Sequence, residues 1–297
     1  SVALSRDGDS LNITRSGGAE VPEQSIVWVK FAGVKNPLSS SPIGSFDVEL
    51  MTSSLLTTDQ GTATVVGNLA SGDLVDFTIT PTTYVAGETG NITVSATITN
   101  PLPSDGSIYV FLPQLVKWAG SMAVKDASFD GTIAYGLVPS KPGVLNVTRN
   151  GDGNETVAGT NIRLLLIDVK NLPFSGDAGN YNMSTRQPNG VFIDVASAAS
   201  VEPTFQPAAL SSVSVAFEDP SSAPRAGQVG NLNVSFTLSN PLPADGKIRI
   251  EMPEEYCMKV DGSNACDQVN VELEGLDGTV SANFSNSVLI MERSGGS

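Results

Sequence analysis

A long segment that occurs twice constrains the fold of this chain more than any other feature. The stretch Ala86–Pro113, AGETGNITVSATITNPLPSDGSIYVFLP, aligns without a gap with Ala226–Pro253, AGQVGNLNVSFTLSNPLPADGKIRIEMP. Both copies contain N-P-L-P followed, after one residue, by Asp-Gly. This shared spacing indicates a duplicated structural unit. The match extends upstream through Val75, which aligns with Val215 at the same offset.

The pattern within each copy predicts β-strands. NITVSATIT and NLNVSFTLS alternate polar and apolar residues with a period of two, as half-buried strands do. Proline cannot donate a hydrogen bond to a sheet, so N-P-L-P ends each strand and Asp-Gly supplies a turn before SIYVFLP or KIRIEMP. Serine, valine and glycine are the three commonest residues and threonine and asparagine are frequent, which favours strands and tight turns. We expect an all-β fold.

A second and weaker repeat covers other parts of the chain. The segment Ile26–Leu50, IVWVKFAGVKNPLSSSPIGSFDVEL, is echoed by Ile162–Thr185, IRLLLIDVKNLPFSGDAGNYNMST. Both contain V-K-N, and Phe46 corresponds to Tyr181. A short strand-like segment precedes each copy, LNITRSGG in the first case and LNVTRNGD in the second. A looser relative, LIMERSGG, lies near the end of the chain.

The order of these repeats predicts tandem β-sandwich modules, with a split half-module at each end. Residues 1–72 form the C-terminal half of a module, 73–208 a complete module and 209–297 the N-terminal half of a module. A half-module exposes strand edges and half a core, so it needs completion. The halves could pair within one chain, between successive chains, or with further modules of a longer repeat polypeptide. Pairing between chains is head-to-tail and generates a filament unless a ring closes.

Composition excludes several classes of function. The 31 acidic against 16 basic residues give a net charge of −15, which opposes binding to nucleic acids and anionic membranes. Histidine is absent, which removes the commonest general base and transition-metal ligand. No apolar run approaches the roughly 20 residues of a membrane span. We therefore expect no catalytic residues, no enzyme activity and no metal site.

The loop Asn150–Glu155, NGDGNE, faintly resembles a calcium loop. It lacks the spacing of a terminal bidentate carboxylate, so calcium is unsupported and a turn is expected. Trp28 and Trp118 stand among valine, phenylalanine and leucine, and we expect both in the core. Cys257 and Cys266 lie nine positions apart, which in a secreted chain predicts one local disulfide.

N-linked glycans are the expected modification. Asn12 and Asn146 occupy the same position in LNIT and LNVT, and Asn91 and Asn233 lie two residues apart on equivalent strands, facing the same side. The chain contains seven N-x-S/T sequons, at Asn12, Asn91, Asn146, Asn154, Asn182, Asn233 and Asn283.

The motifs NPLPSDGSIYVFLP and NPLPADGKIRIEMP, with the GVKNPLSSSPIGSFDVEL segment, resemble repeats of large secreted surface and fibre proteins of protists such as ciliates and algae. The chain is also similar in style to glycan-coated extracellular fibrils. This resemblance implies immunoglobulin-like β-sandwiches arranged in series on the cell surface or in free fibres, without catalytic residues.

These features predict a structural subunit of a glycosylated extracellular filament or surface layer. Copies of the chain would assemble head-to-tail by complementation of strands or half-modules, with glycans and other copies as partners and no cofactor. The alternative is a cell-surface adhesin or an array of carbohydrate-binding modules. That alternative would require a cluster of exposed aromatic side chains.

Overall fold

The computed structural model describes residues 2–7, 10–40, 44–64, 69–125, 128, 130–141, 143–218, 225–257 and 271–295. Within these ranges the protein is all-β and contains no helix. Accordingly, the part of the chain that the structure describes has no helix long and apolar enough to span a membrane. The chain divides into two compact units, Ser1–Asn36 and Pro37–Ser297.

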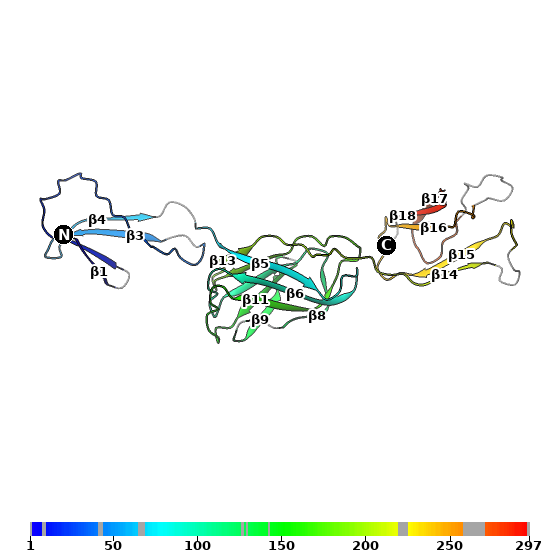
Figure 1. The fold of residues 1–297 in the computed structure, drawn as a ribbon, viewed down its shortest axis with the longest axis horizontal. Helices are drawn as coiled ribbons and strands as arrows, with labels where there is room; N and C mark the ends of the chain where they lie inside the picture. Colours follow the sequence, from blue (N-terminus) through cyan, green and yellow to red (C-terminus); the bar gives the residue numbers. More distant parts are fainter. Residues whose placement is uncertain are drawn as a thin grey trace. The chain divides into compact units, whose positions relative to one another are not determined.

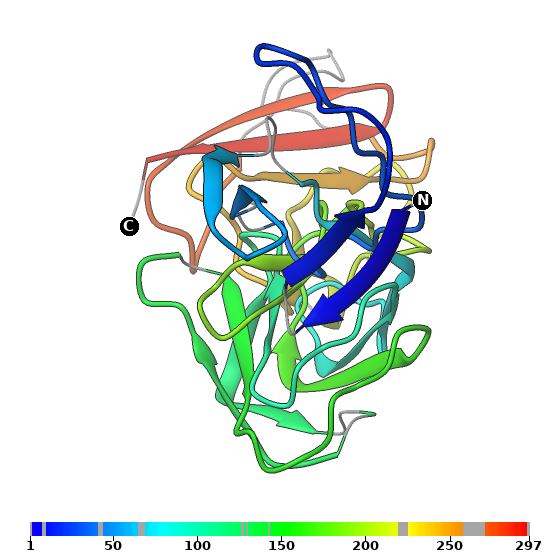
Figure 2. The ribbon, with the colours of Figure 1, turned by 90° about the vertical axis from the view of Figure 1, so that its left-hand side faces the viewer.

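The first unit contains one antiparallel strand pair. Strands β1 (Val2–Asp7) and β2 (Ser10–Arg15) pair along their whole length, and they are the dark-blue arrows in Figure 2. Residues 16–36 form no strand. The side chains of this unit that the structure describes are exposed.

The second unit begins with a hairpin. Strands β3 (Ser45–Met51) and β4 (Thr57–Thr64) are antiparallel, and every residue of both strands is exposed. The apolar side chains of Phe46, Val48 and Leu50 alternate with polar ones. This hairpin therefore presents an apolar face that nothing covers among the described residues.

A nine-stranded sheet follows the hairpin and contains the largest core (Figure 1). Its strand order is β8-β11-β6-β5-β13-β12-β7-β10-β9, and the pairing is antiparallel except between β13 and β5. The strands are β5 (Gly72–Pro81), β6 (Thr89–Ile98), β7 (Ser107–Phe111), β8 (Lys117–Lys125), β9 (Ile133–Leu137), β10 (Val144–Arg149), β11 (Asn161–Lys170), β12 (Asn182–Arg186) and β13 (Phe192–Ala196).

Strands from both ends of this sheet contribute to one core. Ile92 and Val94 of β6 and Leu164 of β11 belong to the same buried cluster as Ile108 of β7 and Leu145 of β10. Along β6 the buried residues alternate with half-buried ones, so one face of each strand points inward. The two ends of the sheet thus enclose a shared core, which is consistent with a β-sandwich.

Two smaller sheets complete the described chain (Figure 1). Strands β14 (Ser211–Phe217) and β15 (Leu232–Thr237) form an antiparallel pair. Strands β16 (Lys247–Glu251), β17 (Thr279–Ser285) and β18 (Val288–Ser294) form a three-stranded sheet in the order β16-β18-β17. Its small core contains Phe284, Leu289 and Met291.

The structure confirms the all-β prediction and the strands expected around both N-P-L-P motifs, which are β6, β7, β15 and β16. Trp118 is half-buried and packs against the large core as expected. The expectation for Trp28 is wrong, because its side chain is 86% exposed. Trp28 aligns with Arg163, an exposed residue on the outer face of β11, so the position faces outward even in the complete sheet.

Candidate interaction surfaces

Three strand pairs share one register. The pairs β1–β2, β9–β10 and β17–β18 are antiparallel hairpins built from the LNITR, LNVTR and LIMER segments. In each pair the arginine that ends this segment lies opposite an apolar residue. Arg15 is opposite Val2, Arg149 opposite Ile133 and Arg293 opposite Val280. The same structural unit therefore occurs in the N-terminal, central and C-terminal parts of the chain.

The hairpin β3–β4 copies the hairpin β12–β13. Leu50 lies opposite Asp59 just as Thr185 lies opposite Asp194, and the register then shifts at the next residue in both hairpins. A shared irregularity of this kind is strong evidence of equivalence, because bulges are specific local features. Asp59 is therefore the structural equivalent of Asp194.

The pair β14–β15 copies β5–β6. Each first strand bulges at a non-glycine residue with positive φ, Asp76 in β5 and Ser212 in β14. The equivalence of Asp76 with Ser212 makes Ser211, not Val215, the counterpart of Val75. The expected alignment of Val75 with Val215 is therefore wrong.

Loop length explains this error. In the complete module Thr82 and Asn91 join β5 to β6 and are nine positions apart, whereas their counterparts Glu218 and Asn231 are thirteen apart. The four extra residues lie before the N-P-L-P repeat, so a gapless alignment fails only upstream of it.

Residues 26–36 are the sequence counterpart of β11 but form no strand. Gly33 and its counterpart Asp168 both have positive φ, at 73° and 56°. The inward-facing residues of β11 are fully buried, whereas their counterparts are exposed. Ile162, Leu164 and Leu166 are each 0% exposed, while Val27, Val29 and Phe31 are 66%, 54% and 55% exposed.

The two terminal parts of the chain therefore hold complementary sets of strands. The N-terminal part has strand counterparts of β9, β10, β12 and β13, and residues 26–36 are a sequence counterpart of β11 that forms no strand. The C-terminal part has counterparts of β5, β6, β7, β9 and β10 within its described residues, and the counterpart of β8 would fall mostly among residues 258–265, which the structure does not describe. Only the β9–β10 counterpart is present at both ends.

Both parts expose apolar side chains that are buried in the central module. In the C-terminal part Leu210 and Val215 are exposed, whereas their counterparts Leu74 and Ile79 are buried. On the hairpin β3–β4 a depression of about 350 Å³ is lined by Val48, Leu50, Asp59, Gln60, Gly61, Thr62 and Ala63. Its counterpart face on β12–β13 contributes to the large core.

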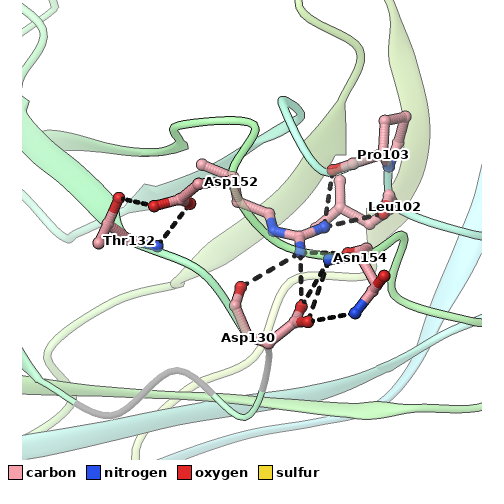
Figure 3. Close-up of polar contacts among 7 residues, drawn as sticks. Leu102, Pro103, Asp130, Thr132, Asp152 and Asn154 are labelled. Carbon is pink, nitrogen blue, oxygen red and sulfur yellow. Dashed lines mark hydrogen bonds and ion pairs between the residues drawn. The ribbon is translucent and has the colours of Figure 1, made fainter.

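A buried arginine holds the N-P-L-P turn in the central module (Figure 3). The guanidinium of Arg149 donates to the carbonyl oxygens of Leu102 (3.1 Å) and Pro103 (2.7 Å) and lies 3.3 Å from the carboxylate of Asp130. Asp130 also accepts hydrogen bonds from the backbone and side-chain nitrogens of Asn154.

The C-terminal part repeats this arrangement. Arg293 donates to the carbonyl oxygens of Leu242 (3.3 Å) and Pro243 (3.2 Å) and pairs with Asp277. In the central and C-terminal parts these arginines explain why the turn motif occurs together with a segment that ends in arginine. Neither arginine was predicted as a functional residue, although the arginine shared by LNITR, LNVTR and LIMER was the available signal.

The electrostatic environment of this cluster favours charged carboxylates. Hydrogen bonds from Asn154 and the charge of Arg149 hold the pKa of Asp130 below its ordinary value. Hydrogen bonds from the hydroxyl and backbone N–H of Thr132 do the same for the pKa of Asp152. Burial of the Arg149 guanidinium lowers its pKa.

The loop that contains Asp152 is therefore a turn held by hydrogen bonds, since the backbone N–H and the hydroxyl of Thr132 donate to the Asp152 carboxylate (Figure 3). Among the described residues no three histidine, cysteine, aspartate or glutamate side chains gather as metal ligands.

A buried carboxylate holds the other end of the N-P-L-P motif. Asp194 of β13 accepts hydrogen bonds from the backbone N–H groups of Thr99 (3.0 Å) and Asn100 (3.0 Å). It also accepts from the Asn100 amide (2.8 Å), and it lies 3.0 Å from the Thr99 hydroxyl, whose single proton is directed mainly to the nearer carbonyl oxygen of Asp73 (2.7 Å). Sequence analysis missed Asp194 as well, because a single aspartate within a strand carries no motif.

The predicted sequons lie on strands and loops with different surroundings. Asn146 of β10 lies opposite Gly136, and Asn283 of β17 lies opposite Ile290, the counterpart of Asn146. With Asn12 at the same position of β2, each of the three hairpins carries a sequon on one equivalent cross-strand pair.

The remaining sequons are more scattered. Asn233 is exposed, and Asn91 and Asn182 are half-buried. Asn154 is exposed, and its side-chain amide donates a hydrogen bond to Asp130 at 2.7 Å. A glycan on this amide nitrogen would compete with that hydrogen bond. Occupancy of all seven sites stays a prediction.

The predicted disulfide lies at the border of the described chain. Cys257 is exposed, and Cys266 lies outside the described residues. The pairing of these cysteines stays a prediction.

No protein-family model matches the chain, and no curated protein matches it either. The resemblance to surface and fibre proteins of protists therefore rests on the motifs alone.

Proposed function

We propose that this chain is a structural subunit of a glycan-bearing extracellular filament or surface layer, built from immunoglobulin-like β-sandwich modules that are completed between copies. The N-terminal part of one copy would supply counterparts of β11, β12 and β13 to the C-terminal part of the next. The complementary strand sets of the two ends support this proposal above all other observations.

Exposed apolar surface supports the same conclusion. Val27, Val29 and Phe31 lie at positions that are fully buried in the complete module, and so do Phe46 and Val48 of β3, whose counterparts are Tyr181 and Met183. Exposed apolar side chains of this extent, on the segment 26–36 that forms no strand and on the hairpin β3–β4 with its open edges, mark interaction surfaces.

The donor and acceptor surfaces are different parts of the chain, so the contact is heterologous. Heterologous contacts extend into filaments unless their rotation closes a ring. The net charge of −15 and glycans on the outer faces of the β9–β10 type hairpins would limit lateral aggregation of such a filament. The proposal includes secretion of the chain and a role like that of the protist fibre proteins it resembles.

The experiment is to secrete the full chain from a glycosylating host and measure its mass against concentration by sedimentation velocity, with negative-stain micrographs of the same samples. We expect a ladder of head-to-tail oligomers and short filaments. Intact mass before and after glycosidase treatment counts the glycans.

A matched pair of variants distinguishes the proposed contact from nonspecific association of exposed apolar side chains. Phe31→Asp places a charge on the donor face and should leave monomers. Trp28→Asp changes an even more exposed residue whose counterpart faces outward, so oligomers should persist. A folded wild-type chain that stays monomeric at every concentration would refute the proposal.

A further inference from the structure

The complete module also indicates how the two ends of neighbouring copies align. We propose that Asp59 of one copy binds Ser239 and Asn240 of the next copy and thereby fixes the register of assembly. This inference rests on the proposed function. It adds a specific polar contact, a strand register and a partner, which is a second copy of this chain.

The template for the contact is the Asp194 site. There β13 runs parallel to β5 with Asp194 opposite Gly72, and the carboxylate accepts N–H hydrogen bonds from Thr99 and Asn100 at 2.8–3.0 Å. The side chain of Asp194 is buried. The contact thus ties the last strand of the module to the start of its N-P-L-P motif.

Each half of this site has a counterpart at one end of the chain. Asp59 corresponds to Asp194 through the shared register and bulge of the two hairpins. Ser239 and Asn240 correspond to Thr99 and Asn100 through the gapless repeat. In the described chain Asp59 is exposed on the apolar face of β3–β4.

The acceptor side already shares one hydrogen bond with the complete site. The hydroxyl of Thr99 donates to the carbonyl oxygen of Asp73 at 2.7 Å, and the hydroxyl of Ser239 donates to the equivalent carbonyl, that of Ala209. The amide of Asn240 donates to the carbonyl oxygen of Ala86 at 3.0 Å. An amide carries two N–H donors, so Asn240 can keep this bond and still donate to a carboxylate.

A second observation supports the same register independently. In the complete module Ser184 of β12 lies opposite Tyr109 of β7. The same register between copies places Glu49 of β3 opposite Arg249 of β16, an opposite-charge pair that favours strand pairing. Within one copy the guanidinium of Arg249 pairs with Glu251 at 3.0 Å, and both side chains are exposed.

This register also places Asp47 opposite Glu251 at the end of the two strands. That like-charged pair opposes association, so the apolar face and the Asp59 contact must outweigh it. A shift of the hairpin by two residues would keep the apolar face inward but would separate Asp59 from Asn240. The Asp59 contact is therefore what distinguishes the correct register from its nearest alternative.

The test uses the full chain and measures the dissociation constant between copies by sedimentation equilibrium. We expect Asp59→Ala to weaken association by about 10- to 100-fold, the range for lost hydrogen bonds to a charged group. Glu20→Ala is the matched control, because it removes an exposed carboxylate of the same N-terminal part that lies outside the hairpin β3–β4. It should change association less than about threefold.

A charge exchange tests the register itself. Glu49→Arg alone and Arg249→Glu alone should each weaken association, and the double variant should recover most of the loss. Wild-type affinity in Asp59→Ala, or no recovery in the double variant, would overturn the proposed register while leaving head-to-tail assembly intact. A monomeric wild-type chain would instead overturn the proposed function.

Discussion

Replacing Asp194 with alanine should destabilise the central module strongly. The substitution removes three N–H hydrogen bonds from a buried carboxylate, two of them from backbone N–H groups that remain in place. Hydrogen bonds to charged groups contribute about 1.5–3 kcal/mol each. Thr99 is exposed and Asn100 half-buried, so water can replace part of the loss. We therefore expect the free energy of unfolding to fall by about 3–5 kcal/mol.

The assay is chemical and thermal unfolding of the full chain, followed by circular dichroism. For a module of this size the loss corresponds to a fall of about 10–20 °C in the unfolding midpoint. Glu155→Ala is the matched control, because Glu155 is an exposed carboxylate of the same module and its loss should change stability by less than about 0.5 kcal/mol. Equal effects of the two variants would refute the reasoning that Asp194 acts through its buried hydrogen bonds.

Three further predictions follow from the hairpins and the arginine cluster. Arg149→Met should lower the free energy of unfolding by about 2–4 kcal/mol, because the carbonyl groups of the N-P-L-P turn lose a charged donor; a loss below 1 kcal/mol in urea unfolding would contradict this. Asp130 and Asp152 have pKa values below the ordinary value of about 3.9, so their contribution to stability is present above that pH and is lost as the pH falls through the lower folded-state values. Urea unfolding should therefore show that the free energy of unfolding falls less between about pH 5 and pH 2 in Asp130→Asn than in the wild type. An identical fall in both proteins would contradict this role of Asp130. Deletion of residues 1–18 should leave oligomers in sedimentation velocity, because the C-terminal part already holds β17–β18; monomers would show that β1–β2 is required.

The strands could be predicted from sequence because their signals are local. Alternation with a period of two, the prolines of N-P-L-P and the Asp-Gly turn together place β6, β7, β15 and β16. The position of β14 relative to β15 could not be placed by the gapless alignment, since loop length varies without changing the strands that the loop joins. Ser212 and Asp76 became recognisable as equivalents only through their positive φ.

The polar contacts of the candidate site could not be predicted because their partners are distant in sequence. Asp194 is 94 positions from Asn100, and Arg149 is 46 positions from Pro103. Each is a single charged residue in a strand, where sequence alone favours a solvated surface position. Their burial follows from the sandwich packing, which brings the strand ends against the turn.

Both ends of the chain carry a counterpart of β9–β10, and a head-to-tail assembly can use only one of the two in each completed module. Completion of one module by the next copy brings together β17–β18 of the first chain and β1–β2 of the second, although the module has room for one such pair. The C-terminal pair has the advantage, because β18 is hydrogen-bonded to β16 and buries Leu289 and Met291, whereas residues 2–6 of β1 and all of β2 are exposed. Donation should therefore begin after β2, with residues 26–36 and the hairpin β3–β4, and the terminal pair β1–β2 should remain outside the completed module.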